Sequence, residues 1–186
     1  IKSIQVVSRL RERGYKLKVE QILRNPVLRI LAEKAEVLEE HISQELVTGE
    51  VVLAPIQKMF FEDDKMKNKN HYNQSVVLAS KERIDQNGLK KCLDKIVLHH
   101  DALRMSFKTE GDLVAQINRG NEDNVYRLSE HDFISSGNPE LSMEETATQI
   151  QRECELSNGA LFRVGLFHLP KGDRLVLISH HLVIDG

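Results

Sequence analysis

The fold of this chain is decided by the stretch LVLISHHLVIDG at residues 175–186. Its first four residues form a continuous apolar run, which is typical of a β-strand that is covered on both faces. The strand delivers two adjacent histidines to its end, where a rigid scaffold can present an imidazole to a ligand. The stretch therefore predicts a buried strand and a candidate site immediately after it.

Helix and strand patterns alternate through residues 51–186. Val76–Ala79 predicts a buried strand, and a capping box at Ser142–Glu145 predicts a helix that is stopped by Asn158 and Gly159. Further patterns predict a helix from near Asp85 to His100, a hairpin around Glu110–Asp112, and two strands at 161–169 and 174–180. This alternation predicts an α/β (α+β) sandwich with a mixed sheet.

The composition fits a globular protein with a core. Hydrophobic residues make up 40% of the 186 residues and charged residues 29%, which excludes disordered and collagen-like chains. A net charge of -2 gives no field for holding nucleic acid or an anionic membrane. No apolar run approaches the roughly 20 residues of a membrane span, so we expect a cytoplasmic location. Cys92 and Cys154 lie far apart, and neither a disulfide nor a zinc site is expected.

His180 and His181 are the candidate catalytic residues. Neutral histidine can accept and return a proton near pH 7, so an imidazole at the end of the strand suits general acid–base catalysis. Because successive strand residues face opposite sides, at most one of the two meets a substrate. Asp185 can fix the following loop or orient an imidazole, and Gly186 permits the turn.

Two alternatives stay open for this histidine pair. A structural role is the commoner one, and the string His99-His100-Asp101 in the same chain shows how readily such pairs arise. Metal binding by His180, His181 and Asp185 is less favoured, because adjacent strand side chains diverge and no further nitrogen or sulfur ligand is in reach by spacing. No metal is therefore expected.

The first forty residues predict small helices with a shared apolar side. Apolar residues recur at helical spacing from Ile1 to Leu10, and Gly14 is a typical helix stop. Asn25 and Pro26 then open another helix, which carries apolar residues as far as Leu38. A segment below roughly 40 residues is seldom stable alone, so we expect the back part of a helical bundle. The predicted organisation is a bundle at 1–40, a linker at 41–50 and a larger domain at 51–186.

Residues 1–40 resemble the second half of a peptidyl carrier protein from a nonribosomal peptide synthetase. The resemblance rests on IKSIQVV at 1–7, the Arg-rich helix end before Gly14, and ILRNP at 22–26. In that family a serine that carries 4'-phosphopantetheine begins this helix, which implies a serine just before Ile1. Ser3 is displaced by a turn and lacks the family's glycines, which favours an ordinary helix-surface serine. An unrelated helical appendage is the alternative.

The motif HHLVIDG at 180–186 resembles the HHxxxDG signature of the condensation and epimerization domains of nonribosomal peptide synthetases. These domains are related in fold to chloramphenicol acetyltransferase. PIQKMFF at 55–61 looks like their first motif and HHDALRM at 99–105 like their second, and the three occur in family order. The resemblance implies that residues 51–186 are the truncated N-terminal lobe of such a domain.

Within that family, the residues at the variable positions of the motifs favour epimerization. PIQ followed by FFE at 60–62, and HYNQ at 71–74 before a strand, are similar to epimerization domains, whereas peptide-bond-forming relatives more often show Ala-Gln and a nearby tryptophan. Met59 is a departure, because epimerization domains often have tryptophan there and this chain has none. A condensation domain and a non-catalytic carrier-docking module remain alternatives.

The resemblance also implies a substrate and partners. The substrate is an aminoacyl or peptidyl thioester on the phosphopantetheine arm of the preceding carrier, and the reaction inverts its Cα from L to D in antibiotic biosynthesis. His181 exchanges the Cα proton, His180 supports the loop, and Asp185 holds the motif by pairing with a basic residue, for which Arg104 is the candidate. The family's other acid/base, a glutamate, belongs to a second lobe, so this part alone is expected to be inactive. The partners are the carrier and other synthetase domains.

Overall fold

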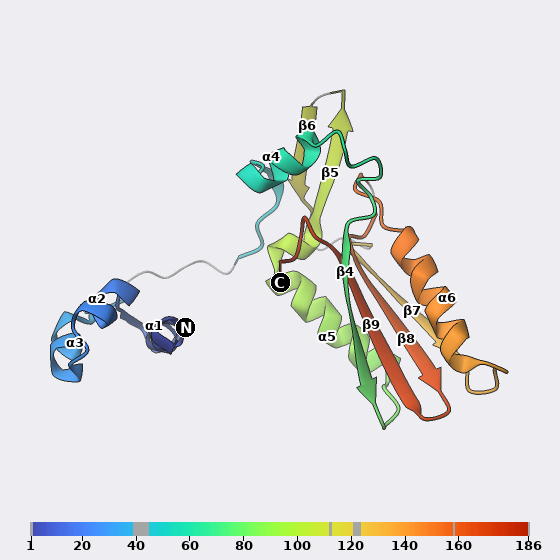
Figure 1. Ribbon diagram of the computed structural model, residues 1–186, viewed down its shortest axis with the longest axis horizontal. Coiled ribbons are helices and arrows are strands. Elements are labelled where there is room, and N and C mark those ends of the chain that lie inside the picture. Colours follow the sequence, from blue (N-terminus) through green and yellow to red (C-terminus); the bar gives the residue numbers. More distant parts are fainter. Residues whose placement is uncertain (1, 39–44, 112, 121–123, 158, 186) are drawn as a thin grey trace. The chain divides into compact units, whose positions relative to one another are not determined.

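The computed structural model describes residues 2–38, 45–111, 113–120, 124–157 and 159–185. The chain forms two compact units, Ile1–Gln44 and Glu45–Gly186, here called the N-terminal and C-terminal units (Figure 1). Ile1, Asn158, Gly186 and part of the predicted linker lie outside the described residues. The assignment of residues 1–40, 41–50 and 51–186 to a carrier, a linker and a catalytic lobe stays a prediction.

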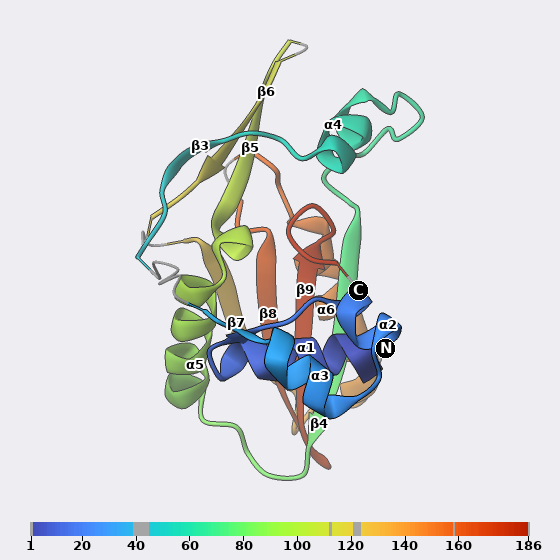
Figure 2. The ribbon, with the colours of Figure 1, turned by 90° about the vertical axis from the view of Figure 1, so that its left-hand side faces the viewer.

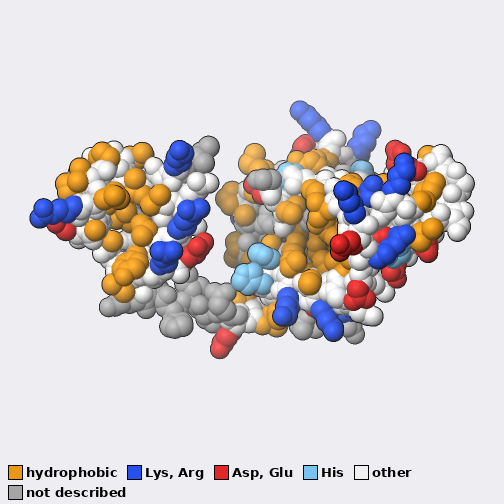
Figure 3. Space-filling model, turned by 90° about the horizontal axis from the view of Figure 1, so that it is seen from below, with side chains coloured by type: hydrophobic (Ala, Val, Ile, Leu, Met, Phe, Trp, Pro, Cys, Tyr) orange, Lys and Arg blue, Asp and Glu red, His pale blue; other side chains and the backbone are white. Residues whose placement is uncertain are grey.

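The N-terminal unit contains three short helices, α1 (Lys2–Glu12), α2 (Val19–Arg24) and α3 (Leu28–Lys34). Leu17 and Leu31 are buried in it. Several other apolar side chains face outward, with Leu28 82% exposed and Leu23 70% exposed. Figure 3 shows hydrophobic side chains gathered on the surface of this unit.

The second predicted helix of this unit ends earlier than expected. The second predicted helix was expected to reach Leu38, but α3 ends at Lys34 and β2 (Glu36–Val37) pairs antiparallel with β1 (Tyr15–Lys16). Gly14 has a φ of 80°, which glycine adopts without steric cost, and its carbonyl accepts a hydrogen bond from the Leu38 N–H at 2.8 Å. The pairing of β1 with β2 gives hydrogen-bond partners to backbone N–H and C=O groups that would otherwise have been paired within a longer helix.

The C-terminal unit is built on a four-stranded sheet in the order β4-β9-β8-β7. Its strands are β4 (Asn73–Ser80), β9 (Gly172–His180), β8 (Phe162–Leu169) and β7 (Tyr126–Asp132). Strand β7 runs parallel to β8 and the other neighbours are antiparallel, so the predicted mixed sheet is confirmed.

Two helices cover the two faces of this sheet (Figures 1 and 2). Helix α5 (Gln86–His99) packs Leu93 and Val97 against one face, and α6 (Pro139–Arg152) packs Ile150 against the other. The apolar run of β9 alternates between them, with Leu177 on the α5 side and Ile178 on the α6 side. The sequence-based expectation of a strand covered on both faces is confirmed.

A second, three-stranded sheet has the order β3-β6-β5. It consists of β3 (Gly49–Val51), β6 (Leu113–Asn118) and β5 (Met105–Glu110), and it includes the predicted hairpin. A 3-10 turn, η1 (Asp101–Arg104), leads into β5, and α4 (Pro55–Glu62) begins at the proline. Side chains of α4 and β5 share a core with Val183, which follows the histidine pair, so this sheet supports the candidate site.

Two details of the sheet and its helices differ from the predictions. Strand β4 lies at the sheet edge, and Val76 and Val77 are each 55% exposed although a buried strand was expected. Helix α6 begins at Pro139, because the Asn138 side chain caps it by accepting from the Leu141 N–H, and it ends at Arg152, not at 158–159. The hydroxyl of Ser142 donates to the Asn138 carbonyl, so it does not act as the predicted cap.

Candidate active site

His180 lies at the end of β9 and is fully buried. The Leu182 N–H donates to its Nδ1 at 3.2 Å, so the neutral ring carries its proton on Nε2, which donates to the Lys69 carbonyl at 2.8 Å. Burial lowers the pKa of His180, partly opposed by the bond to Lys69. Both ring nitrogens are therefore occupied by backbone groups, and the imidazole fastens the loop after β9 to the segment before β4.

His181 follows directly after β9 and is only half-buried. Its Nδ1 lies 2.9 Å from the Ile184 carbonyl, and because a carbonyl oxygen can only accept, Nδ1 carries the proton. Its Nε2 then holds the lone pair in the neutral ring, and it lies 3.0 Å from Nε2 of Gln74. The ring stacks on Tyr72 with centroids 5.1 Å apart, while its own backbone N–H donates to the Tyr72 carbonyl at 2.8 Å.

The two histidines differ in the hydrogen bonds of their ring nitrogens, and therefore in the chemistry that each can perform. Both ring nitrogens of His180 bond to backbone groups, whereas the basic nitrogen of His181, in a fixed tautomer, contacts the Gln74 side chain. Both imidazoles contact the ring of Tyr72, and only His181 is among the residues that line the pocket next to it. The arrangement suits His181 for proton transfer and His180 for support of the loop.

The first motif lies against the loop that follows the histidines. Gln57 of α4 accepts from the Ala54 N–H at 2.8 Å and donates through Nε2 to the Leu182 carbonyl at 3.3 Å. Phe60 presents its ring edge-on to His180, with centroids 5.7 Å apart. Residues that are more than a hundred positions apart in sequence therefore meet at one site.

A pocket of about 750 Å³ opens between α4 and this loop. Its walls are largely apolar and include Ile56, Met59 and Phe60 from α4. His181 and Asp185 also line it, and Asp185 is exposed. The structure thus places His181 and Asp185 at one pocket and holds His180 beneath the same loop.

The predicted partner of Asp185 is wrong. Arg104 is fully buried and pairs with Asp101, and its guanidinium also donates to the carbonyls of Val97 and Leu98 at 2.6 and 2.8 Å. These carbonyls end α5, and a cation there is favourable for the helix dipole. The second motif therefore has a structural role: it terminates α5 and starts β5.

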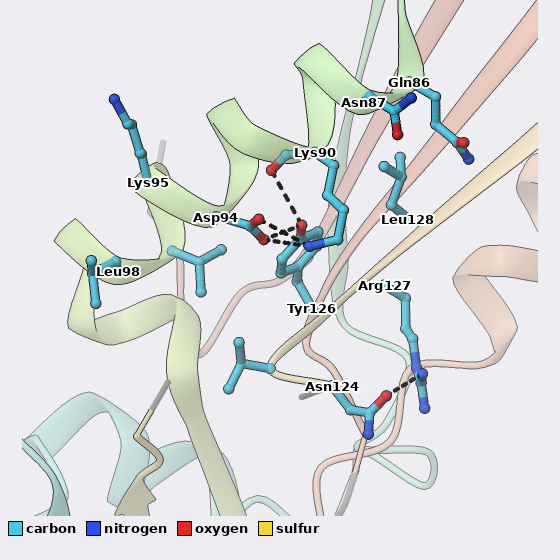
Figure 4. Close-up of a pocket in the computed structure, with 12 residues that line it drawn as sticks. Gln86, Asn87, Lys90, Asp94, Lys95, Leu98, Asn124, Tyr126, Arg127 and Leu128 are labelled. Carbon is cyan, nitrogen blue, oxygen red and sulfur yellow. Dashed lines mark hydrogen bonds and ion pairs between the residues drawn. The ribbon is translucent and has the colours of Figure 1, made fainter. Parts of the chain in front are cut away.

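A second hollow, of about 850 Å³, lies between α5 and β7 (Figure 4). The Tyr126 hydroxyl donates to Asp94 at 2.6 Å, and Lys90 pairs with the same carboxylate at 2.9 Å. The hydrogen bond from Tyr126, followed by the contacts with Lys90, lowers the pKa of Asp94, and burial together with Asp94 raises the pKa of Tyr126. Because these polar groups satisfy one another, we assign the active site to the pocket at His181.

Two contact residues of His181 were not identified as site residues from the sequence. Tyr72 and Gln74 belong to the run HYNQ, whose only signal was its similarity to one subtype of the family. Their contact with the ring depends on the register between β4 and β9, in which Gln74 lies opposite Ser179. The register of two paired strands cannot be predicted from a single sequence.

The cysteines and acidic residues give no second candidate. Cys154 is buried, and burial raises the pKa of its thiol, which disfavours a nucleophilic role. Within the described ranges, no three His, Cys, Asp or Glu residues are grouped so that they could hold a metal ion. The described helices also include none that is long and apolar enough to cross a membrane.

Comparison with known proteins agrees with this geometry. Tyrocidine synthase 2 from Brevibacillus parabrevis is 37% identical over 186 residues, and surfactin synthase subunit 1 from Bacillus subtilis (strain 168) is 38% identical over 188 residues. Both alignments cover 100% of this chain, which spans only 5% of the length of each relative.

Solved structures show the same fold. The epimerization domain from the third module of tyrocidine synthetase B matches with a TM-score of 0.74 and 39% identity, over 77% of this chain and 33% of that chain. The starter condensation domain of rhizomide synthetase matches with a TM-score of 0.61 and 18% identity, over 75% and 34%. Residues 47–186 match the family described as "Condensation domain". The chain therefore belongs to the condensation domain family.

Proposed function

We propose that this chain supplies the N-terminal lobe of an epimerization domain in a nonribosomal peptide synthetase. The complete domain inverts the Cα of a carrier-bound aminoacyl or peptidyl thioester. The observation that carries the proposal is the His181 imidazole, held with its proton on Nδ1 and its lone pair on Nε2. The 39% identity to an epimerization domain, against 18% to a starter condensation domain, supports this subtype.

His181 is the base in this proposal. The phosphopantetheine-bound group supplies a thioester, whose carbonyl acidifies the adjacent Cα–H. After the Gln74 amide turns away from Nε2, the Nε2 lone pair of His181 accepts that proton, and the Ile184 carbonyl stabilises the resulting imidazolium through the Nδ1–H. Delivery of a proton to the opposite face of the carbon inverts the centre. The family resemblance gives that step to a glutamate of a second lobe, and we assign no residue of this chain to it.

The pocket fits this substrate class. Its apolar wall from α4 suits an aminoacyl side chain or the thin pantetheine arm. His180 touches no substrate in this scheme. It keeps the loop of His181 in place through its bonds to Lys69 and Leu182.

We further propose that the N-terminal unit is the C-terminal part of a peptidyl carrier domain that delivers the thioester. Support comes from the curated relatives, which align with all of this chain and not only with residues 47–186. In this proposal the phosphopantetheine is attached to a serine that precedes Ile1.

The test is exchange of the substrate Cα hydrogen for solvent deuterium in a synthetase module that contains this chain and a loaded carrier. We expect deuterium wash-in, and a loss of about 10²–10⁴-fold in its rate for His181→Ala. His99→Ala, a substitution in the exposed histidine pair at 99–100, is the matched control and should leave the rate unchanged.

The alternatives give different results in the same assay. Peptide-bond formation without wash-in would assign the chain to condensation, in which His181 assists an attacking amine. Wash-in at the full rate in His181→Ala would remove the catalytic role and leave a lobe that only docks the carrier.

A further inference from the structure

The lone pair of His181 is not free in this structure. The Gln74 Nε2 lies 3.0 Å from the His181 Nε2, and with the imidazole proton fixed on Nδ1 by Ile184, the Gln74 amide is the donor. Gln74 therefore bonds to the very nitrogen that acts as the base in the proposed function.

Backbone contacts bring the start of β4 beside the ring. Gln74 belongs to β4, and its neighbour Tyr72 both accepts a hydrogen bond from the His181 N–H and stacks on the imidazole. Gln74 is half-buried and is not among the residues that line the pocket, whereas His181 is. The amide thus contacts the imidazole from the sheet and not from the cavity.

A carboxamide can serve both protonation states of an imidazole. Its N–H group donates to the lone pair of the neutral ring, and after a half turn of the amide its oxygen accepts from the protonated ring. A leucine can do neither, and a carboxylate only accepts. The side chain at position 74 therefore determines which protonation states of His181 have a matched hydrogen-bond partner.

We propose that Gln74 is a positioning residue that keeps Nε2 of His181 as the basic nitrogen and matches the imidazole in both of its protonation states. This inference deepens the proposed function and rests on it for its catalytic meaning. Its structural content, the coupling between Gln74 and the protonation of His181, is measurable without any reaction.

Other ionisable groups of the site act as a constant background. Asp63 at the end of α4, Tyr72 before β4 and Asp185 in the loop after β9 line the same pocket, and His180 precedes His181 in the chain. Because these groups are present in every variant, a change in the titration of His181 between variants reports on position 74.

The experiment is an NMR titration of the His181 imidazole in the 186-residue chain, with its nitrogen shifts reporting the tautomer. Gln74→Glu keeps the size of the side chain, so we expect the fold to persist and the titration midpoint to move to higher pH by about one unit. Gln74→Leu should reduce the Nδ1–H preference of the neutral ring. Gln74→Met is the second apolar variant if the leucine disturbs β4.

Ser179→Ala is the matched control. Ser179 lies opposite Gln74 in the register of β4 and β9, and its hydroxyl has no hydrogen-bond partner among the described residues. We expect it to leave the titration of His181 unchanged. A midpoint in Gln74→Glu that stays within about 0.2 pH unit of the unsubstituted chain would overturn the inference, because a nearby carboxylate must favour the imidazolium.

Deuterium wash-in in the complete module separates this inference from the proposed function. With both correct, Gln74→Glu moves the rising limb of the pH–rate profile to higher pH, and Gln74→Leu lowers the rate by at least about tenfold. A shifted titration without any wash-in would uphold the coupling of Gln74 and His181 and overturn the proposed function. Wash-in with an unmoved titration would overturn the role of Gln74 alone.

Discussion

Replacement of His180 by alanine is expected to destabilise the C-terminal unit severely. The side chain is fully buried and bonds to two backbone groups, the Lys69 carbonyl and the Leu182 N–H. Each buried backbone group left without a partner costs about 1–3 kcal/mol. Loss of the edge contact with Phe60 adds about 0.5–1.5 kcal/mol. Because local relaxation recovers part of this sum, we expect a loss of about 3–5 kcal/mol in the free energy of unfolding.

Equilibrium urea unfolding of the 186-residue chain, followed by circular dichroism, measures this loss. His99→Ala is the control, because that side chain is exposed, and a change of no more than about 0.5 kcal/mol is expected. His180→Asn keeps one donor and one acceptor on a shorter side chain and should recover part of the loss. A cost of less than about 1 kcal/mol for His180→Ala would refute the reasoning, since it would mean that neither backbone group depends on the imidazole.

The difference in stability between the unsubstituted chain and His180→Ala should also depend on pH. Burial holds the folded-state pKa of His180 below its ordinary value of 6.5, so the unfolded chain takes up the proton first as the pH falls. The stabilisation from neutral His180 is therefore complete above pH 6.5 and is lost as the pH falls through the lower folded-state pKa. The gap in stability between the unsubstituted chain and His180→Ala should narrow in that range, and a gap that widens would contradict the sign.

Three further predictions concern the scaffold. Gly172→Ala should lower the free energy of unfolding by about 2–4 kcal/mol, because φ at this position is 109° and a Cβ would lie 2.2 Å from a carbonyl oxygen of β4. Gly137→Ala is the control in thermal unfolding, because a Cβ there meets no atom within 4 Å. Arg104→Met should lower the urea midpoint by the equivalent of about 3 kcal/mol, because two carbonyls at the end of α5 lose their donor; an unchanged midpoint would contradict this. Hydrogen bonds to Glu130 and Asp173 raise the pKa of His168. Protonated His168 therefore stabilises the folded chain fully below pH 6.5, and this stabilisation is lost as the pH rises through the higher folded-state pKa. His168→Gln should make the melting temperature depend less steeply on pH in that range.

The strands that carry the site could be predicted because their apolar residues are continuous. Strands β8 and β9 are covered on both faces, and a short apolar run such as LVLI at 175–178, followed by polar residues, is typical of such strands. Strand β7 was missed because its sequence, YRLSEHD at 126–132, is mostly polar and none of its residues is fully buried; it joins the sheet through its parallel pairing with β8. Strand β4 looked equally buried from its composition, but a position at the sheet edge is a property of topology and not of the strand itself.

The candidate site was predicted in part for a similar reason. His181 could be identified from the strand end and the motif, but its tautomer depends on Ile184 and Gln74, and the second of these reaches the ring only through strand pairing. The expected pair of Asp185 and Arg104 was wrong because Asp101 lies three residues before Arg104 in η1, where a local ion pair needs no chain closure. Local contacts of this kind compete well with distant ones.

The contacts that assemble the site also bear on how the chain folds. Gln57 and Leu182 are 125 positions apart, Lys69 and His180 are 111 apart, and Gln74 and His181 are 107 apart. Ordering such long loops costs entropy before any contact repays it, so pairings of this separation slow folding. We therefore expect the helices and the β5–β6 hairpin to form early and the site to form last. During synthesis on the ribosome, the imidazole of His181 has no defined environment until almost the entire C-terminal unit has emerged.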